Sequence, residues 1–133
     1  MKMIGFFQEM DSGYPKSWGG NILHPGPNTE KYPVCDVVGY LKSGYPILDV
    51  MELTIDVIGG SFRVPGGSSV LTDGIFVWRE DLSSYVEKYH INLPQDFLAA
   101  IQKNEFNIPP ISREVLLQIS VEASRALGFQ PRP

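Results

Sequence analysis

Ser68-Ser69-Val70-Leu71-Thr72-Asp73-Gly74-Ile75-Phe76-Val77-Trp78 is the stretch of sequence that decides the fold. Two runs rich in β-branched and aromatic residues flank Asp73-Gly74, a dipeptide that tolerates the positive φ values of a type I′ turn. The stretch therefore predicts a β-hairpin, whose two strands must be antiparallel. Its second run is apolar on both faces. Such a strand is either covered on both sides, which we expect, or it carries an exposed aromatic site at Phe76 and Trp78.

Helical periodicity appears on both sides of this hairpin. Apolar residues at the i, i+3, i+4, i+7 spacing predict helices over residues 33–43 and 80–90. A third helix is expected to open at residues 92–94, with Phe97 turned inward. Ser112 is a suitable cap for a fourth helix, and Gly128 is a suitable end for it.

The remaining segments carry weaker signals. Residues 1–10 resemble an opening strand, and residues 11–30 are rich in Gly, Pro, Ser and Asn and predict an irregular loop. Residues 46–60 fit either period, and we favour an extended segment there. Residues 129–133 are expected to form a frayed tail. Together these features predict a single α+β domain over residues 1–133, with a small, mostly antiparallel sheet and three to four packed helices.

Composition narrows the class of protein. The 133 residues carry a net charge of −4, and the eleven cations are scattered, which argues against direct nucleic-acid binding. Residues 30–60 hold five acids against two lysines. An acidic surface of this kind steers association with a basic partner, or it simply keeps the protein soluble. No segment resembles a signal peptide or a membrane span, so we expect a cytoplasmic protein.

Residues that could catalyse a reaction or bind a metal do not occur at the spacing that such a site requires. His24 and His90 are far apart, and neither has a second ligand at metal-binding spacing. The single cysteine, Cys35, lies in an apolar helical segment and is expected to be a small core residue. We therefore predict no catalytic residue, no metal site and no cofactor. The alternative is a small hydrolase or transferase built from His24, Ser69 and Asp73.

The acids of the central region are the candidate partner-binding residues. Asp49, Glu52 and Asp56 would share one face if their segment were helical, because their spacing is i, i+3, i+7. Such a ridge would attract a cationic partner, or it would only be solvated. Asp73 joins the candidate set, although its turn alone is enough to explain it.

The sequence also resembles a known family along most of its length. The likeness rests on the 66–74 segment, on Val77-Trp78-Arg79-Glu80-Asp81-Leu82, on Tyr85-Val86-Glu87-Lys88-Tyr89-His90, and on Leu93-Pro94 with Phe97-Leu98. It is similar to a family of small bacterial proteins whose core reads SSLLTDG-x-W-x-W, an acidic residue before Leu, YVE-x-YH and LP-x-x-F. Phe76 departs from this pattern, since the family often has Trp there, and the last helix matches poorly.

The resemblance implies a function that the residues alone do not. Members of the family look like immunity proteins of bacterial polymorphic or contact-dependent toxin systems. They bind and block a cognate toxin domain, often a basic nuclease, and no catalytic residue can be carried over. The resemblance therefore implies an inhibitor that acts by steric and electrostatic occlusion. Another reading is an accessory oligomerising domain that uses Phe76 and Trp78 as an apolar patch.

Overall fold

The computed structural model describes residues 1–23 and 31–129. Within these ranges the chain forms four α-helices, one short 3-10 helix and six strands. Their order along the chain is β1 (Lys2–Met3), η1 (Lys16–Trp18), α1 (Val34–Lys42), β2 (Tyr45–Leu48), β3 (Leu53–Ile55), β4 (Arg63–Pro65), β5 (Val70–Thr72), β6 (Phe76–Arg79), α2 (Leu82–Tyr89), α3 (Gln95–Lys103) and α4 (Arg113–Ala126).

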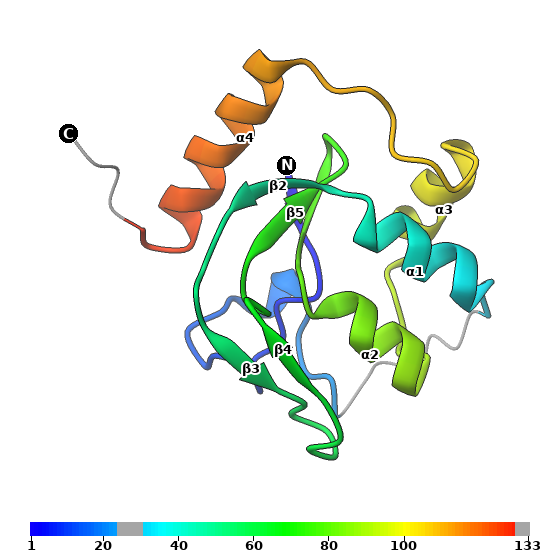
Figure 1. The fold of residues 1–133 in the computed structure, drawn as a ribbon, viewed down its shortest axis with the longest axis vertical. Helices are drawn as coiled ribbons and strands as arrows, with labels where there is room; N and C mark the ends of the chain where they lie inside the picture. The colour runs from blue at the N-terminus through cyan, green and yellow to red at the C-terminus, as the bar shows by residue number, and fades with distance from the viewer. Residues whose placement is uncertain (24–30, 130–133) are drawn as a thin grey trace.

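The strands form two sheets. The larger sheet has the order β1-β6-β5-β2, and β5 is antiparallel to both of its neighbours, whereas β1 is parallel to β6. The smaller sheet is the antiparallel ribbon β3–β4, which lies at the lower end of the view in Figure 1. The predicted α+β fold with a mostly antiparallel sheet is therefore confirmed.

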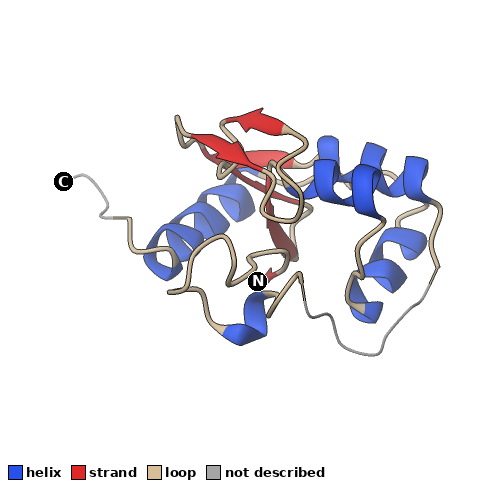
Figure 2. Cartoon of the chain, turned by 90° about the horizontal axis from the view of Figure 1, so that it is seen from below, coloured by secondary structure: helices blue, strands red, loops and turns tan. Residues whose placement is uncertain are grey.

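Helices cover both faces of the larger sheet. Leu71 and Trp78 are paired across β5 and β6 and belong to the cluster that includes the buried residues of α1, α2 and α3. Val70 and Val77 point the other way and pack with Phe6 and with Ile119 of α4. Figures 1 and 2 show α4 on one side of the strands and α1–α3 on the other. This arrangement explains why the hairpin strands are apolar on both faces.

The central aromatic residues of the hairpin are buried, as expected. Phe76 is 4% exposed and Trp78 is 0% exposed. The Trp78 indole Nε1 donates to the Leu41 carbonyl at 3.1 Å, so its polar atom is satisfied inside the core. The ring of Tyr40 on α1 stacks near it, with 6.1 Å between ring centroids.

The four predicted helices are confirmed at nearly the expected positions. Ser112 caps α4, because its Oγ accepts from Val115 N at 3.2 Å, and Gly128 beyond the helix has a φ of 82°. Ile119 and Ala123 form the buried stripe of α4. The segment that fitted both periods is extended, because it contains β2 and β3.

The hairpin turn differs from the type I′ turn that its sequence predicts. Gly74 has a φ of 103°, but Asp73 does not have a positive φ. The Asp73 carboxylate Oδ1 instead accepts from the backbone N of Ile75 at 3.0 Å and of Phe76 at 2.8 Å. Residues 73–75 separate the two strands, and a side chain supplies an acceptor that closes this loop.

Four other expectations need correction or lie partly outside the described residues. The opening strand is only two residues long, because Gly5 takes a φ of 72° and packs against Leu82. Cys35 is exposed on α1 and is not a core residue. Residues 24–30 of the predicted loop and 130–133 of the predicted tail lie outside the described residues.

None of the helices in the described ranges has the length and apolar character that a bilayer crossing requires.

Candidate functional site

The four acids predicted to contact a partner divide into two exposed and two buried side chains. Asp49 and Glu52 are exposed, whereas Asp56 and Asp73 are each only 4% exposed. A shared helical face does not exist, because residues 53–55 form a strand. Any surface contact made by this set therefore falls to Asp49 and Glu52, whose role stays a prediction.

Asp73 is used inside the fold. Besides closing the hairpin turn, its Oδ2 accepts from the Tyr40 hydroxyl at 2.6 Å. The Tyr40 hydroxyl in turn accepts from Asn104 Nδ2 at 3.1 Å. Burial, and then the hydrogen bond to Asp73, raises the pKa of Tyr40 well above its ordinary value. The carboxylate ties the hairpin to α1 and to the end of α3, and this explains its burial.

Asp56 organises the turn between β3 and β4. Its Oδ1 accepts from Ile58 N at 2.8 Å, and its Oδ2 accepts from Ser61 N at 3.0 Å and from the Tyr89 hydroxyl. Burial acts to raise the pKa of this carboxyl, but the hydrogen bonds from Tyr89, Ser61 and Ile58 outweigh it and hold the pKa well below the usual value. Asp56 is thus an ionised anchor between the ribbon and α2, and not a free surface charge.

Strand β3 pairs with β4 along one edge, and no other strand of the described residues pairs with its second edge. Gly66 N donates to Glu52 O at 2.8 Å, and Asp56 N donates to Phe62 O at 3.0 Å. An antiparallel ladder uses alternate residues, so Leu53 and Ile55 turn their backbone N–H and C=O groups away from β4. These groups lie along the outer edge of the ribbon, and within residues 1–23 and 31–129 none of them has a hydrogen-bond partner.

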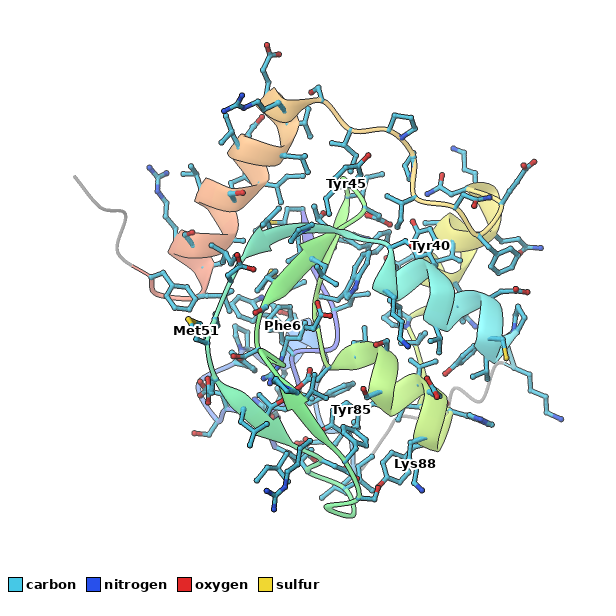
Figure 3. All side chains as sticks on the ribbon, in the orientation of Figure 1. Phe6, Tyr40, Tyr45, Met51, Tyr85 and Lys88 are labelled. Atoms are coloured by element: carbon cyan, nitrogen blue, oxygen red, sulfur yellow. The ribbon has the colours of Figure 1, made fainter. Side chains whose placement is uncertain are left out.

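A groove with a volume of about 290 Å³ lies beside this edge. Two chain segments line it: Glu52 to Ile55 with Val57, and the loop that contains Met10, Asp11 and Tyr14. Buried side chains from β6 and the start of α2 complete the lining. One of them is Tyr85, which extends from α2 toward the ribbon (Figure 3) and accepts from Val57 N at 2.9 Å.

A buried ion pair occupies the deep part of the groove. Arg79 binds Asp81 through two parallel hydrogen bonds, Nε to Oδ1 at 3.1 Å and Nη2 to Oδ2 at 2.8 Å. Thr54 Oγ1 donates to the same carboxylate at 3.0 Å, and Arg79 Nη1 donates to the Tyr14 hydroxyl at 3.3 Å. Burial raises the pKa of Asp81, and attraction to Arg79 opposes that rise. The pair joins the end of β6 to β3 and to the 10–14 loop.

The charges that the groove leaves uncompensated are negative. Arg79 and Asp81 neutralise each other, while Asp11 and Glu52 are exposed acids that also line the groove. Glu52 Oε2 accepts from Ser68 Oγ at 3.1 Å, and Asp11 Oδ1 accepts from Gly13 N at 2.8 Å. Both contacts are with neutral groups, and no ion pair among the described residues involves either carboxylate.

Apolar side chains project beside the same edge. Leu53 and Ile55 are 52% and 51% exposed, and Met51 is fully exposed. Figure 3 shows Met51 at the periphery of the chain, on the side of β2 and β3. Three apolar residues at alternate positions of one exposed segment form a patch suited to contact with another molecule. We call Met51, Leu53, Ile55 and the adjoining groove the β3 surface.

Other surface features are less specific. Leu117 and Val121 are exposed one turn apart on α4, but the backbone of a helix is already paired internally, so it offers no open edge. Two larger hollows, of about 750 and 600 Å³, involve Leu23 and Lys31 respectively. Both adjoin residues 24–30, which lie outside the described residues.

The structure does not bring together Ser69 and Asp73, the two described residues of the alternative enzyme site. Ser69 and Asp73 lie at opposite ends of β5, and the Ser69 hydroxyl contacts the backbone of Val50. His24 lies outside the described residues. Within residues 1–23 and 31–129, no group of three or more His, Cys, Asp or Glu side chains could hold a metal ion. The alternative reading of Phe76 and Trp78 as an exposed apolar patch is wrong, because both side chains are buried.

Several residues of the β3 surface were not predicted. Arg79 carried a usable signal, because a buried arginine at the end of an apolar strand requires an acidic partner, and Asp81 follows two residues later. Asp11 and Tyr14 carried no such signal, because only the path of the chain brings them next to β3.

Comparison with known proteins adds no relative: no family model, no curated protein and no solved structure matches the chain.

Proposed function

We propose that this protein is an immunity protein that binds a cognate bacterial toxin domain in the cytoplasm and neutralises it by occlusion. The proposal joins the family resemblance of residues 66–98 to one structural observation. That observation is the β3 surface. Exposed apolar side chains, an open strand edge and the acids Asp11 and Glu52 occur together there. The combination suits protein contact, since apolar area supplies affinity and charge supplies steering.

Electrostatics supports a basic partner. The net charge of −4 and the exposed acids Asp49 and Glu52 would attract a cationic protein over distances set by the Debye length. A nuclease domain that binds phosphates carries such a basic surface. An acidic inhibitor covering that surface would compete directly with the nucleic acid.

Co-expression tests the proposal. We expect a large toxin reading frame directly upstream of the gene, and its C-terminal domain should arrest growth when expressed alone. Co-expression with this chain should restore growth, and the two proteins should co-purify. Persistent growth arrest together with failure to co-purify would refute the proposed function.

A charge-reversal pair then tests the role of the acids. Asp49→Lys with Glu52→Lys should slow association with the toxin domain and weaken its dependence on salt. Glu87→Lys with Glu122→Lys is the matched control, because it makes the same change in net charge at exposed helix positions away from the β3 surface. Asp56 is left intact, because it is buried in its turn. Equal association rates for the two double variants would exclude these acids from steering.

A further inference from the structure

We infer that the β3 surface receives an extended, basic segment of the partner, which pairs as a strand with the open edge of β3 and places a Lys or Arg side chain between Asp11 and Glu52. The inference rests on the proposed function and specifies the chemistry of the partner segment that this chain would hold.

The open edge favours an extended segment over a helix. Leu53 and Ile55 direct backbone donors and acceptors away from β4, with a spacing that matches the ladder of another strand. Adding a strand to an exposed edge is a recurring mode of peptide recognition, in which the main chain supplies affinity and alternate side chains supply specificity. The exposed side chains of Met51, Leu53 and Ile55 would provide those alternate contacts.

The ribbon also indicates which of its two edges is suited to this role. On β4, the residues opposite Ile55 and Leu53 are Arg63 and Pro65. Their backbones face the outer edge of β4, and Pro65 has no N–H to donate. Proline and charge on an edge strand are features that block strand addition. The β3 edge carries neither feature at its outward-facing positions, so it is the edge left open to a partner.

Charge selects a basic segment and disfavours a second copy of this chain. Asp11 and Glu52 line the groove, and Asp49 is exposed directly after β2. Two copies paired edge to edge would bring these acids together, and like charges on adjoining strands destabilise the pair. A partner strand with Lys or Arg would instead form ion pairs at the rim of the groove. The volume of about 290 Å³ is at the lower limit for small-molecule sites, so the groove suits a side chain better than a free ligand.

A proline substitution tests the backbone pairing. Leu53→Pro removes one outward-facing N–H, and it leaves the β3–β4 hydrogen bonds in place, because residue 53 faces away from β4. Leu53→Ala is the matched control, because it removes the same side chain and keeps the N–H. We expect Leu53→Pro to bind the C-terminal toxin domain about tenfold more weakly than Leu53→Ala in a binding titration.

A second pair of variants tests the cation and does not depend on whether the proline variant folds. Asp11→Asn with Glu52→Gln removes both groove charges but retains carbonyl acceptors for Gly13 N and Ser68 Oγ. Glu87→Gln with Glu122→Gln is the control of equal charge. The groove variant should bind at least about tenfold more weakly and lose most of the salt dependence, while the control keeps the affinity of the unsubstituted chain.

The possible outcomes separate this inference from the proposed function. If the unsubstituted chain binds the toxin domain and both test variants bind as their controls do, the groove assignment fails while the immunity function stands. If the unsubstituted chain does not bind the toxin domain, both proposals fail. A dimer of the free chain that Leu53→Pro dissociates would assign the edge to a second copy and overturn the inference.

Discussion

Individual carboxylates in this protein differ in role according to the donors around them. Asp56 and Asp73 are surrounded by backbone N–H and hydroxyl donors and are buried, whereas Asp49 and Glu52 remain at the surface. All four were candidates in the sequence, although the turn alone was enough to explain Asp73. Sequence spacing cannot distinguish them, because the donors to Asp56 and Asp73 include hydroxyls from distant helices.

Replacing Asp56 with Asn tests its role as an anchor. The amide would place an N–H group against the donors from Ser61 or Tyr89, so we expect the free energy of unfolding to fall by about 1–3 kcal/mol at neutral pH. Asp49→Asn, at an exposed site, should change it by less than about 0.5 kcal/mol. Urea unfolding measures both, and similar effects of the two substitutions would contradict the assignment.

The same substitution has a predicted pH dependence. Because the folded-state pKa of Asp56 is lower than the unfolded value of about 3.9, its stabilising contribution is complete above about pH 4 and is lost as pH falls toward the folded pKa. The stability difference between the native chain and Asp56→Asn should therefore narrow below about pH 4. A difference that stays constant from neutral to acidic pH would contradict the lowered pKa.

Two glycines allow a matched test of close packing. A Cβ on Gly67 would lie 1.8 Å from Thr54 Oγ1 and 3.0 Å from the Val64 carbonyl, whereas a Cβ on Gly39 would meet nothing within 4 Å. We expect Gly67→Ala to destabilise the fold by about 1–3 kcal/mol. Gly39→Ala should stabilise it by about 0.5–1 kcal/mol, because Gly39 lies inside α1. Thermal unfolding of the two variants should shift in opposite directions.

At the scale of elements, the ion pair between Arg79 and Asp81 connects strands and a helix. It links the end of β6 to Thr54 on β3 and to the residue that precedes α2. The pair also supports the groove on which the proposed contact depends. Two contacts therefore attach the β3–β4 ribbon to α2. Thr54 on β3 donates to Asp81, the residue before α2, and Tyr89 on α2 donates to Asp56.

Breaking this pair from one side should be costly. Arg79→Met leaves the Asp81 carboxylate buried without a countercharge, so we expect a loss of about 3–5 kcal/mol. Adding Asp81→Asn to that variant should recover part of the loss, because the uncompensated charge is removed. Chemical denaturation of the two variants gives the comparison. A double variant less stable than Arg79→Met alone would show that the unpaired charge is not the main cost.

The elements themselves were largely predictable from the sequence. The helices followed from apolar stripes such as Val37, Val38 and Leu41, and the hairpin followed from two β-rich runs around Asp73-Gly74. The exact turn was not predictable, because the acceptor that closes it is a side chain. The β3 surface was only partly predictable: Glu52 was a candidate, but the groove depends on tertiary placement of the 10–14 loop.

At the scale of the whole molecule, the buried Tyr85 and the partly buried Tyr32 link stability to alkaline pH. Burial raises the pKa of Tyr32 and of Tyr85 to about 12. Since the unfolded value is about 10, the folded state holds these protons more tightly, and stability should fall as pH rises from about 10 to about 12. Tyr85→Phe should lose less stability over this interval than the native chain. Urea unfolding at both pH values, with tyrosinate absorbance as a second readout, measures this difference.

The β3 surface combines several independent features that favour contact with a partner. The open strand edge, the exposed apolar residues and the uncompensated acids all occur at β3. Helices cover both faces of the larger sheet, so the hairpin that decides the fold is inside and serves stability. In this account, folding and recognition are carried by different strands.

Amide hydrogen exchange of this chain with and without the toxin domain tests the proposed contact most directly. The account predicts slowed exchange at Leu53 and Ile55 and in the 10–14 loop when the toxin domain is present, with α4 unchanged. Protection confined to α4, or no protection anywhere in the chain, would contradict it.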